Sequence, residues 1–478
     1  MEGGQRSAFF ISEVRGHGNF VKTLLTLLFN GLLVVNVMAA VHYDISDPDV
    51  VAQVDDLVLS PQVIDIFWQA YNHPSRPITP PQAMQRIVDE ALLAQHARDV
   101  LAASQLNREN KVGFLKQVEQ QDRATALLRK FFEKPLYNAI QNLPGKSLDG
   151  IYQFNDDVNT AWLKKHFSLE SKLRVEATPE QIQLAKSTTL ASVILSSGAQ
   201  TSLTQTSEET EKSIKILSLW DIYQRLNVQG RVAVHNGDLN FLKAQVRQRV
   251  GSLFVLFWAQ SNMAEQDYQA VFQIVMNESD KATLMKNLGL HTDIHNDNPV
   301  LREKAKQVSE EEILAFYNEH KEEFRVIEKV KARHLQLTSQ QQADDVHQEI
   351  KRGLSFEAAV LKYSVADDKT KQPAGNLGWL KRSDKHRSWL HSVAFTQPAG
   401  KVSVPFRSPQ NAGAIVYEIL YIDERVEGYL PVTDPTVNYE ASRDIALKKL
   451  KRNFSILQAE LRKNAHIRLN QSLKGNGR

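Results

Sequence analysis

The stretch VKARHLQL, residues 330–337, alternates apolar and polar side chains in the way of a strand that buries one face. It also places His334 in the middle of that run. Buried polar groups are normally hydrogen-bonded for structural reasons alone, yet histidine is also a frequent member of functional sites. The residues by themselves leave both interpretations of His334 open.

Around this strand the sequence has the pattern of a small α+β domain. From residue 328 to residue 423, strand-like runs alternate with short helical runs and with turns that contain glycine or proline. Gly353 stands where a first helix should end, and the run IVYEILYI at residues 415–422 is dense in the residues of a central strand. We therefore expect a compact domain over residues 326–425.

The rest of the chain indicates a mainly helical domain. Helical patterns continue from Ser60 to about residue 290, after a short β segment, and Ser309 begins a capping box that starts another helix. Residues 426–478 contain an amphipathic helix whose leucine stripe needs a partner. We expect that helix to pack back on the N-terminal helices, so the fold class is α+β, with the small domain inserted into a discontinuous helical domain that begins at residue 41.

Composition narrows the classes of function. The 478 residues carry a formal net charge of +3, spread evenly, which argues against nucleic acid as the main partner. The chain has no cysteine, so disulfides, thiolate nucleophiles and Cys-ligated zinc are excluded. The absence of cysteine also fits an oxidising compartment.

The N-terminus predicts export. Residues 23–41, TLLTLLFNGLLVVNVMAAV, are uncharged and follow Lys22. The run ends in small residues of the kind that a signal peptidase reads, so residues 1–40 are expected to be a signal peptide, with a retained membrane anchor as the alternative. Either outcome places the remaining chain outside the cytoplasm, in the periplasm, and retention would attach it to the inner membrane.

The order of the motifs in the small domain carries a family resemblance. After the strand VKARHLQL come IKRGLSFEAAVLKYS at 350–364, AGNLGWL at 374–380, VAF at 393–395, PAGKVSVPF at 398–406 and GAIVYEILYID at 413–423. This series resembles the parvulin (PpiC-like) family of peptidyl-prolyl cis-trans isomerases. Residues 51–67 and 308–324 are more weakly similar to the chaperone domain of SurA-like and PpiD-like periplasmic folding factors.

The resemblance implies a set of pocket residues. The family's first-strand histidine corresponds to His334. The Cys or Asp after the YS pair falls on Ala366, and the adjacent Asp367 is the residue that we expect to act there with His334. The remaining positions are expected to bind substrate; the family's Met and Phe fall on His386 and Leu390, its last-strand histidine falls on Ile415, and Trp389 and Phe395 complete the set.

The implied function is that of an exported folding factor which isomerises X-Pro bonds in unfolded or newly secreted polypeptides. Rotation about an X-Pro bond crosses a barrier of about 20 kcal/mol without breaking a covalent bond, so no cofactor and no metal is expected. A non-enzymatic chaperone whose parvulin-like domain only binds peptide is the alternative, because Ala366 and Ile415 depart from the family pattern. A maturation factor dedicated to one secreted system is a third interpretation. The segment HTDIHND at 291–297 is expected to be a solvated loop rather than a metal site.

Overall fold

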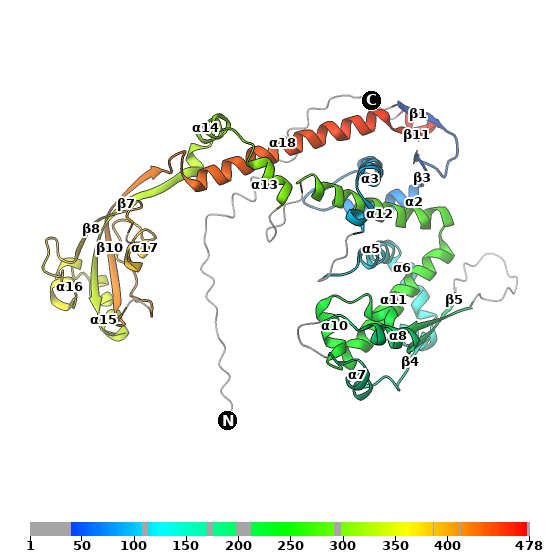
Figure 1. The fold of residues 1–478 in the computed structure, drawn as a ribbon, viewed down its shortest axis with the longest axis horizontal. Coiled ribbons are helices and arrows are strands. Elements are labelled where there is room, and N and C mark those ends of the chain that lie inside the picture. Colours follow the sequence, from blue (N-terminus) through cyan, green and yellow to red (C-terminus); the bar gives the residue numbers. More distant parts are fainter. Residues whose placement is uncertain are drawn as a thin grey trace. The chain divides into compact units, whose positions relative to one another are not determined.

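The structure is a computed structural model that describes residues 40–107, 113–169, 175–196, 212–290, 298–385, 387–410 and 413–475. Outside these ranges lie the predicted export segment up to Ala39, the HTDIHND segment, His386 and most of residues 196–207, whose Ser/Thr/Gln-rich sequence predicts a loop. The chain divides into two compact units, Met1–Asn287 with Arg452–Arg478, and Leu288–Lys451 (Figure 1). The first unit is therefore discontinuous in sequence.

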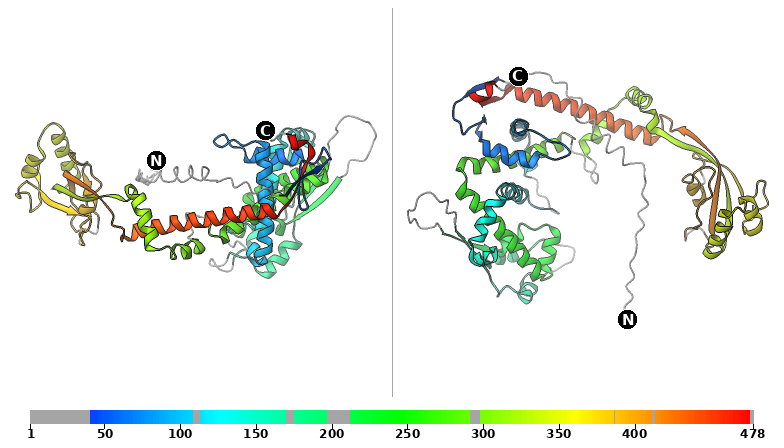
Figure 2. Two further views of the ribbon diagram at one scale, coloured as in Figure 1. Left: turned by 90° about the horizontal axis from the view of Figure 1, so that it is seen from above. Right: turned by 180° about the vertical axis from the view of Figure 1, so that it is seen from behind.

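A small sheet in the first unit joins its two segments. The strands are β1 (Ala40–Ile45), β2 (Ala52–Val54), β3 (Leu57–Leu59) and β11 (His466–Asn470), in the order β1-β11-β2-β3. β11 pairs in parallel with β1 and antiparallel with β2, so the blue and red ends of the colour scale lie side by side (Figure 2). The predicted short β segment is the β2–β3 hairpin, which turns at Asp55 with a φ of 50°.

Helices make up most of the first unit. They are α2 (Pro61–Tyr71), α3 (Pro80–Val100), α4 (Ala103–Leu106), α5 (Lys116–Phe131), α6 (Glu133–Gln141), α7 (Thr160–His166), α8 (Pro179–Ser187), α9 (Leu219–Tyr223), α10 (Val228–His235), α11 (Leu239–Asn262) and α12 (Glu265–Asn287). Ser60 caps α2 as its sequence predicts, with its side chain accepting from Val63 N. The uncharged run VGSLFVLFWA at residues 250–259, whose length predicts a core helix rather than a membrane span, lies within α11 and contributes to the main hydrophobic core.

The helical pattern expected up to residue 290 is interrupted by a second sheet. β4 (Tyr152–Phe154), β5 (Thr189–Ser196) and β6 (Lys212–Ser218) form an antiparallel sheet in the order β4-β5-β6. Apolar runs as short as these have no period long enough to separate a strand from a buried helix, so the sequence pattern does not predict this sheet.

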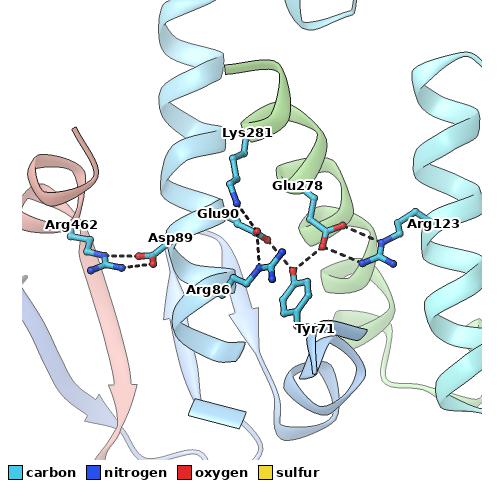
Figure 3. A network of polar contacts seen from close by, with 8 residues as sticks. All are labelled: Tyr71, Arg86, Asp89, Glu90, Arg123, Glu278, Lys281 and Arg462. Atoms are coloured by element: carbon cyan, nitrogen blue, oxygen red, sulfur yellow. Dashed lines mark hydrogen bonds and ion pairs between the residues drawn. The ribbon is translucent and has the colours of Figure 1, made fainter. Parts of the chain in front are cut away.

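A network of charged and polar side chains connects α2, α3, α5 and α12 (Figure 3). The buried Glu90 of α3 accepts from Lys281 of α12 at 2.8 Å and lies 2.9 Å from the Tyr71 hydroxyl, which is also 2.8 Å from Glu278. Burial, and then the charge of Glu90, raise the pKa of that hydroxyl. Beside the network, Arg462 holds Asp89 of α3 with two hydrogen bonds (Figure 3). The C-terminal helix is thus attached to the N-terminal helices within the first unit.

The second unit is built around a four-stranded antiparallel sheet in the order β8-β7-β10-β9. Its elements are α13 (Pro299–Ala305), α14 (Glu310–Glu319), β7 (Arg325–Leu337), α15 (Gln340–Lys351), α16 (Phe356–Tyr363), β8 (Asn376–Lys381), α17 (Trp389–Ala394), β9 (Phe406–Arg407) and β10 (Tyr417–Tyr429), and α18 (Pro435–Asn464) begins here and ends in the first unit. The capping box at Ser309 is present at the start of α14. The expected α+β class is confirmed.

The units divide at a different place from the expected boundary. The boundary between the two units falls between Asn287 and Leu288. Helices α13 and α14 therefore belong to the same unit as the sheet and not to the helical domain. Among the helices of the described ranges, none combines the length and the apolarity that a bilayer crossing needs.

The two faces of the second unit's sheet bury different apolar clusters. Leu335 and Leu337 of β7 pack with α15 and α16. Val330 and Ala332 pack with Leu390 of α17 on the other face. Because side chains alternate along a strand, His334 follows Val330 and Ala332 and lies on the α17 face.

Candidate functional site

Backbone contacts fix the position of His334. It lies in β7 opposite Leu420 of β10, and its N–H donates to the carbonyl of Gly375 at 2.9 Å. Gly375 has a φ of 69°, and a Cβ there would lie 2.1 Å from the carbonyl oxygen of His334. Only glycine fits this close approach, which explains the AGNLG turn in the sequence.

Two carboxylates hold the imidazole of His334. Its Nδ1 lies 2.9 Å from Oε2 of Glu418 on β10, and its Nε2 lies 3.0 Å from Oδ1 of Asp368. The other carboxylate oxygen of Glu418 accepts from Gln336 Nε2 at 2.8 Å. Ionised carboxylates only accept hydrogen bonds, so this pair of contacts favours the imidazolium form, in which both ring nitrogens donate. We call Gln336, His334, Glu418 and Asp368 the His334 cluster.

His334 and Glu418 of the cluster are buried, and the charges around the ring favour its protonated form. His334 is 6% exposed and Glu418 is 1% exposed. Burial acts to lower the pKa of His334, but the hydrogen bond and charge of Glu418, and then those of Asp368, outweigh it and raise the pKa above its ordinary value. A buried charge has to be paired, and this histidine has a partner on each side.

The structure brings a different aspartate to His334 from the one that the sequence indicated. Asp367 is exposed, Ala366 is buried, and the carboxylate in contact with His334 belongs to Asp368. The segment between α16 and β8 has no regular secondary structure, so spacing alone does not show which aspartate turns inward. Asp368 is the residue that the sequence analysis missed.

The residue that reaches His334 from the last strand also differs from the expected one. Ile415 precedes β10 and is 48% exposed, so it does not line the cluster. The side chain that reaches His334 from β10 is Glu418, three residues later. A charged residue inside the apolar run IVYEILYI needs a partner, and so does His334 inside VKARHLQL. An ionisable residue inside each of these two strands was the sequence signal for their pairing.

Apolar side chains lie beside the cluster on the same face. Leu390 is buried in the core cluster of Ala332 and Leu420, and Trp389 and Phe395 pack against that core. The Trp389 ring contacts Phe406 edge-on, with 5.8 Å between ring centroids. Three of the predicted substrate-binding residues therefore gather on the α17 face.

A second buried histidine on this face has a structural contact. His391 of α17 donates from Nε2 to the carbonyl oxygen of Lys381 at 3.0 Å, and its ring stacks on Phe395 with 5.3 Å between centroids. It ties α17 to the end of β8. The described residues contain no group of three or more His, Cys, Asp or Glu side chains arranged to hold a metal ion.

The arrangement suits a reaction without covalent chemistry. A fixed charged edge next to an apolar surface can orient a peptide backbone while a proline ring leaves water. An amide twisted out of plane loses its charge-separated resonance form, and apolar surroundings disfavour the planar, charge-separated form most. No acid, base or metal has to enter the rotation.

Comparison with known proteins defines the class of this unit. Residues 308–434 match the family described as the PPIC-type PPIASE domain. The segment begins one residue before the α14 capping box and ends just before α18. This part of the chain is a parvulin-type peptidyl-prolyl isomerase domain.

Individual relatives agree with that class. Foldase protein PrsA of Caldanaerobacter subterraneus subsp. tengcongensis is 31% identical over 105 residues, which cover 22% of this chain and 33% of the relative. The chain thus spans about a third of the length of the curated relative it matches.

Solved structures with local similarity include SurA-like chaperones and PrsA proteins. One from Campylobacter jejuni, described among two structurally related SurA-like chaperones, is 18% identical over 47% of this chain and 83% of its own, with a TM-score of 0.20. PrsA from Bacillus subtilis is 18% identical over 47% of this chain and 73% of its own, with a TM-score of 0.18. The class therefore rests on the domain match.

Proposed function

We propose that this protein is an exported folding factor that accelerates cis-trans isomerisation of X-Pro bonds in unfolded polypeptides. The observation that carries the proposal is the His334 cluster, which lies beside an apolar surface within a PPIC-type domain. Export is supported by the uncharged run at residues 23–41. Sequencing the N-terminus of the mature protein tests the export step.

The apolar surface and the His334 cluster have different roles in this proposal. The proline ring packs against the apolar side chains around Trp389 and Leu390, where water is excluded. The His334 cluster keeps a fixed arrangement of charge beside them and orients the peptide backbone. The twisted amide is favoured because both parts are preorganised.

The decisive experiment uses the two tryptophans of the second unit. Trp389 packs on the α17 face, whereas Trp379 pairs with Lys331 on the opposite face of the sheet. The full chain should accelerate proline-limited refolding of an unfolded client. Trp389→Ala should reduce the acceleration about tenfold, because an aromatic part of the apolar surface is lost, and Trp379→Ala should not. No acceleration by the full chain would contradict the enzymatic proposal.

One observation favours a second candidate, a chaperone that binds peptide without catalysis. Both ring nitrogens of His334 are occupied by carboxylates, and the partner on β10 is Glu418 rather than a histidine. Under this candidate, suppression of client aggregation should be equal for the wild type and for His334→Ala. If that substitution abolished suppression while the fold stayed intact, the binding-only candidate would fail.

A further inference from the structure

The first unit contains a cavity of about 360 Å³ that the isomerase does not use. Its walls come from the segment before α5, from α5, α9, α10 and α11, and from the turn between α9 and α10. Phe114, Leu226 and Phe241 supply apolar surface, and Arg225 and Arg249 supply positive charge. The volume is at the lower end of small-ligand sites, so it accommodates one or two residues rather than a long segment.

The two arginines share an acceptor, and Arg249 keeps a buried donor without a partner. Arg225 contacts Asp122 at 2.5 Å and donates to Gln121 Oε1 at 2.6 Å, and Arg249 donates to the same Gln121 oxygen at 3.2 Å. The Nε–H of Arg249 is buried without a hydrogen-bond partner. Two guanidinium groups thus share one amide oxygen and one carboxylate, although each has five N–H donors.

The charges near Arg249 also bear on the kind of ligand that the cavity would bind. Arg225 and Arg249 are the two cations of the lining and Asp122 is its one carboxylate, while the charge of Asp221 acts on Arg249 from outside the lining. Burial, and then the nearby charge of Arg225, lower the pKa of the Arg249 guanidinium to about 10. An anion that entered the cavity would relieve this repulsion and satisfy the buried donor.

We propose that this cavity binds the C-terminal carboxylate of a polypeptide whose last residue is apolar. A planar carboxylate accepts in-plane hydrogen bonds from guanidinium groups. At a chain end, the carboxylate and the last side chain share one Cα, so both enter a small cavity together and meet its charged and apolar walls. The chain continues outward from one point only, which suits a cavity of this size.

The proposal rests on the proposed function only in taking an unfolded polypeptide as the ligand. The cavity lies in the first unit and shares no residue with the His334 cluster. Binding and isomerisation are therefore measured separately. Loss of one with the other intact identifies which proposal fails.

The test is calorimetric titration of the full chain with three probes. They are N-acetyl-Ala-Ala-Leu as the free acid, the same peptide as its C-terminal amide, and hexanoate. The free acid should bind at least about tenfold more tightly than the amide, since charge-assisted hydrogen bonds are lost in the amide. Equal binding of acid and amide, or no binding of the acid, overturns the proposal. Hexanoate binding as tightly as the peptide also overturns it, because the cavity would then take small acids rather than chain ends.

Two variants on one helix locate the site. Arg249→Met should weaken binding of the free acid about tenfold or more. Arg247→Met removes the same charge from α11 two residues away, where the side chain is exposed and pairs with Asp149, and binding should not change. Equal losses in both variants would show only a general charge effect and would overturn the assignment to the cavity. Isomerisation of a short X-Pro peptide should be unchanged in both.

Discussion

His334 is held by negative charge on both sides, and this makes its protonation part of the stability of the second unit. The folded state raises its pKa above the unfolded value of about 6.5. The stabilisation is therefore fully present below about pH 6.5 and is lost as the pH rises through the folded pKa. The charge on the imidazole therefore adds to the backbone pairing of β7 with β10 and links the Asp368 segment to both.

The first prediction concerns this pH dependence. The free energy of unfolding of the second unit should fall as the pH is raised above about 6.5, and His334→Gln should show a flatter profile over the same range. Denaturant unfolding at a series of pH values measures both. Equal slopes in the wild type and the variant would contradict the role assigned to His334.

The second prediction separates two neighbouring aspartates. Asp368→Asn removes one of the charges that raise the pKa of His334, so that pKa should fall, and the acceleration of refolding should fall about tenfold. Asp367→Asn is the matched control, because Asp367 is exposed and the carboxylate at His334 belongs to Asp368. NMR titration of the imidazole measures the pKa. A larger effect of Asp367→Asn would return the role to the residue that spacing alone suggests.

At this scale the sequence predicts some residues and not others, for physical reasons. His334 is identified by strand alternation, which is local. Glu418 depends on the register that places Leu420 opposite His334, and Asp368 depends on the course of an irregular segment. Register and loop course are set by tertiary contacts that a single sequence does not display.

Among the elements, β11 has an interior position in its sheet despite its short length. Ile467 is buried, whereas the neighbouring His466 is exposed, as alternation along a strand requires. β1 has β11 as its neighbour in the sheet order. The pairing that keeps β1 in the sheet is therefore its pairing with β11.

The third prediction tests that dependence. Ile467→Lys buries a charge in the sheet and should destabilise it by about 3 kcal/mol, whereas His466→Lys should change stability by less than about 0.5 kcal/mol. Hydrogen exchange of the β1 amides should become faster in the first variant only. Unchanged exchange in Ile467→Lys would show that β1 is held by other contacts.

The fourth prediction concerns the network of α3 and α12 in Figure 3. Glu90→Ala leaves Lys281 and the buried Tyr71 hydroxyl without their shared partner, and should cost about 3 kcal/mol of unfolding free energy. Asp99→Ala on the same helix removes an exposed carboxylate that contacts Gln95, and should cost less than about 0.5 kcal/mol. Urea unfolding followed by circular dichroism measures both. Similar losses of unfolding free energy in the two variants would show that the buried Glu90 contributes no more to stability than an exposed carboxylate.

For the whole molecule, the sequence pattern predicts a discontinuous helical unit and an inserted α+β domain because amphipathic stripes and motif order persist over long stretches. The cavity between α5, α10 and α11 was not predicted. Its walls include Phe114 and Ser252, which are far apart in sequence, and no wall residue is unusual by itself. Features assembled from many distant positions leave no local pattern to recognise.

The parallel pairing of β1 with β11 has a consequence for the order of synthesis. Asp44 and Arg468, which form an ion pair across these strands, are separated by 424 positions. During translation the second unit, Leu288–Lys451, emerges complete while the first unit still lacks an interior strand. A product truncated before residue 466 retains the isomerase domain but leaves β1 without its partner. The sheet of the first unit therefore reaches its full strand order only after residues 466–470 have been synthesised.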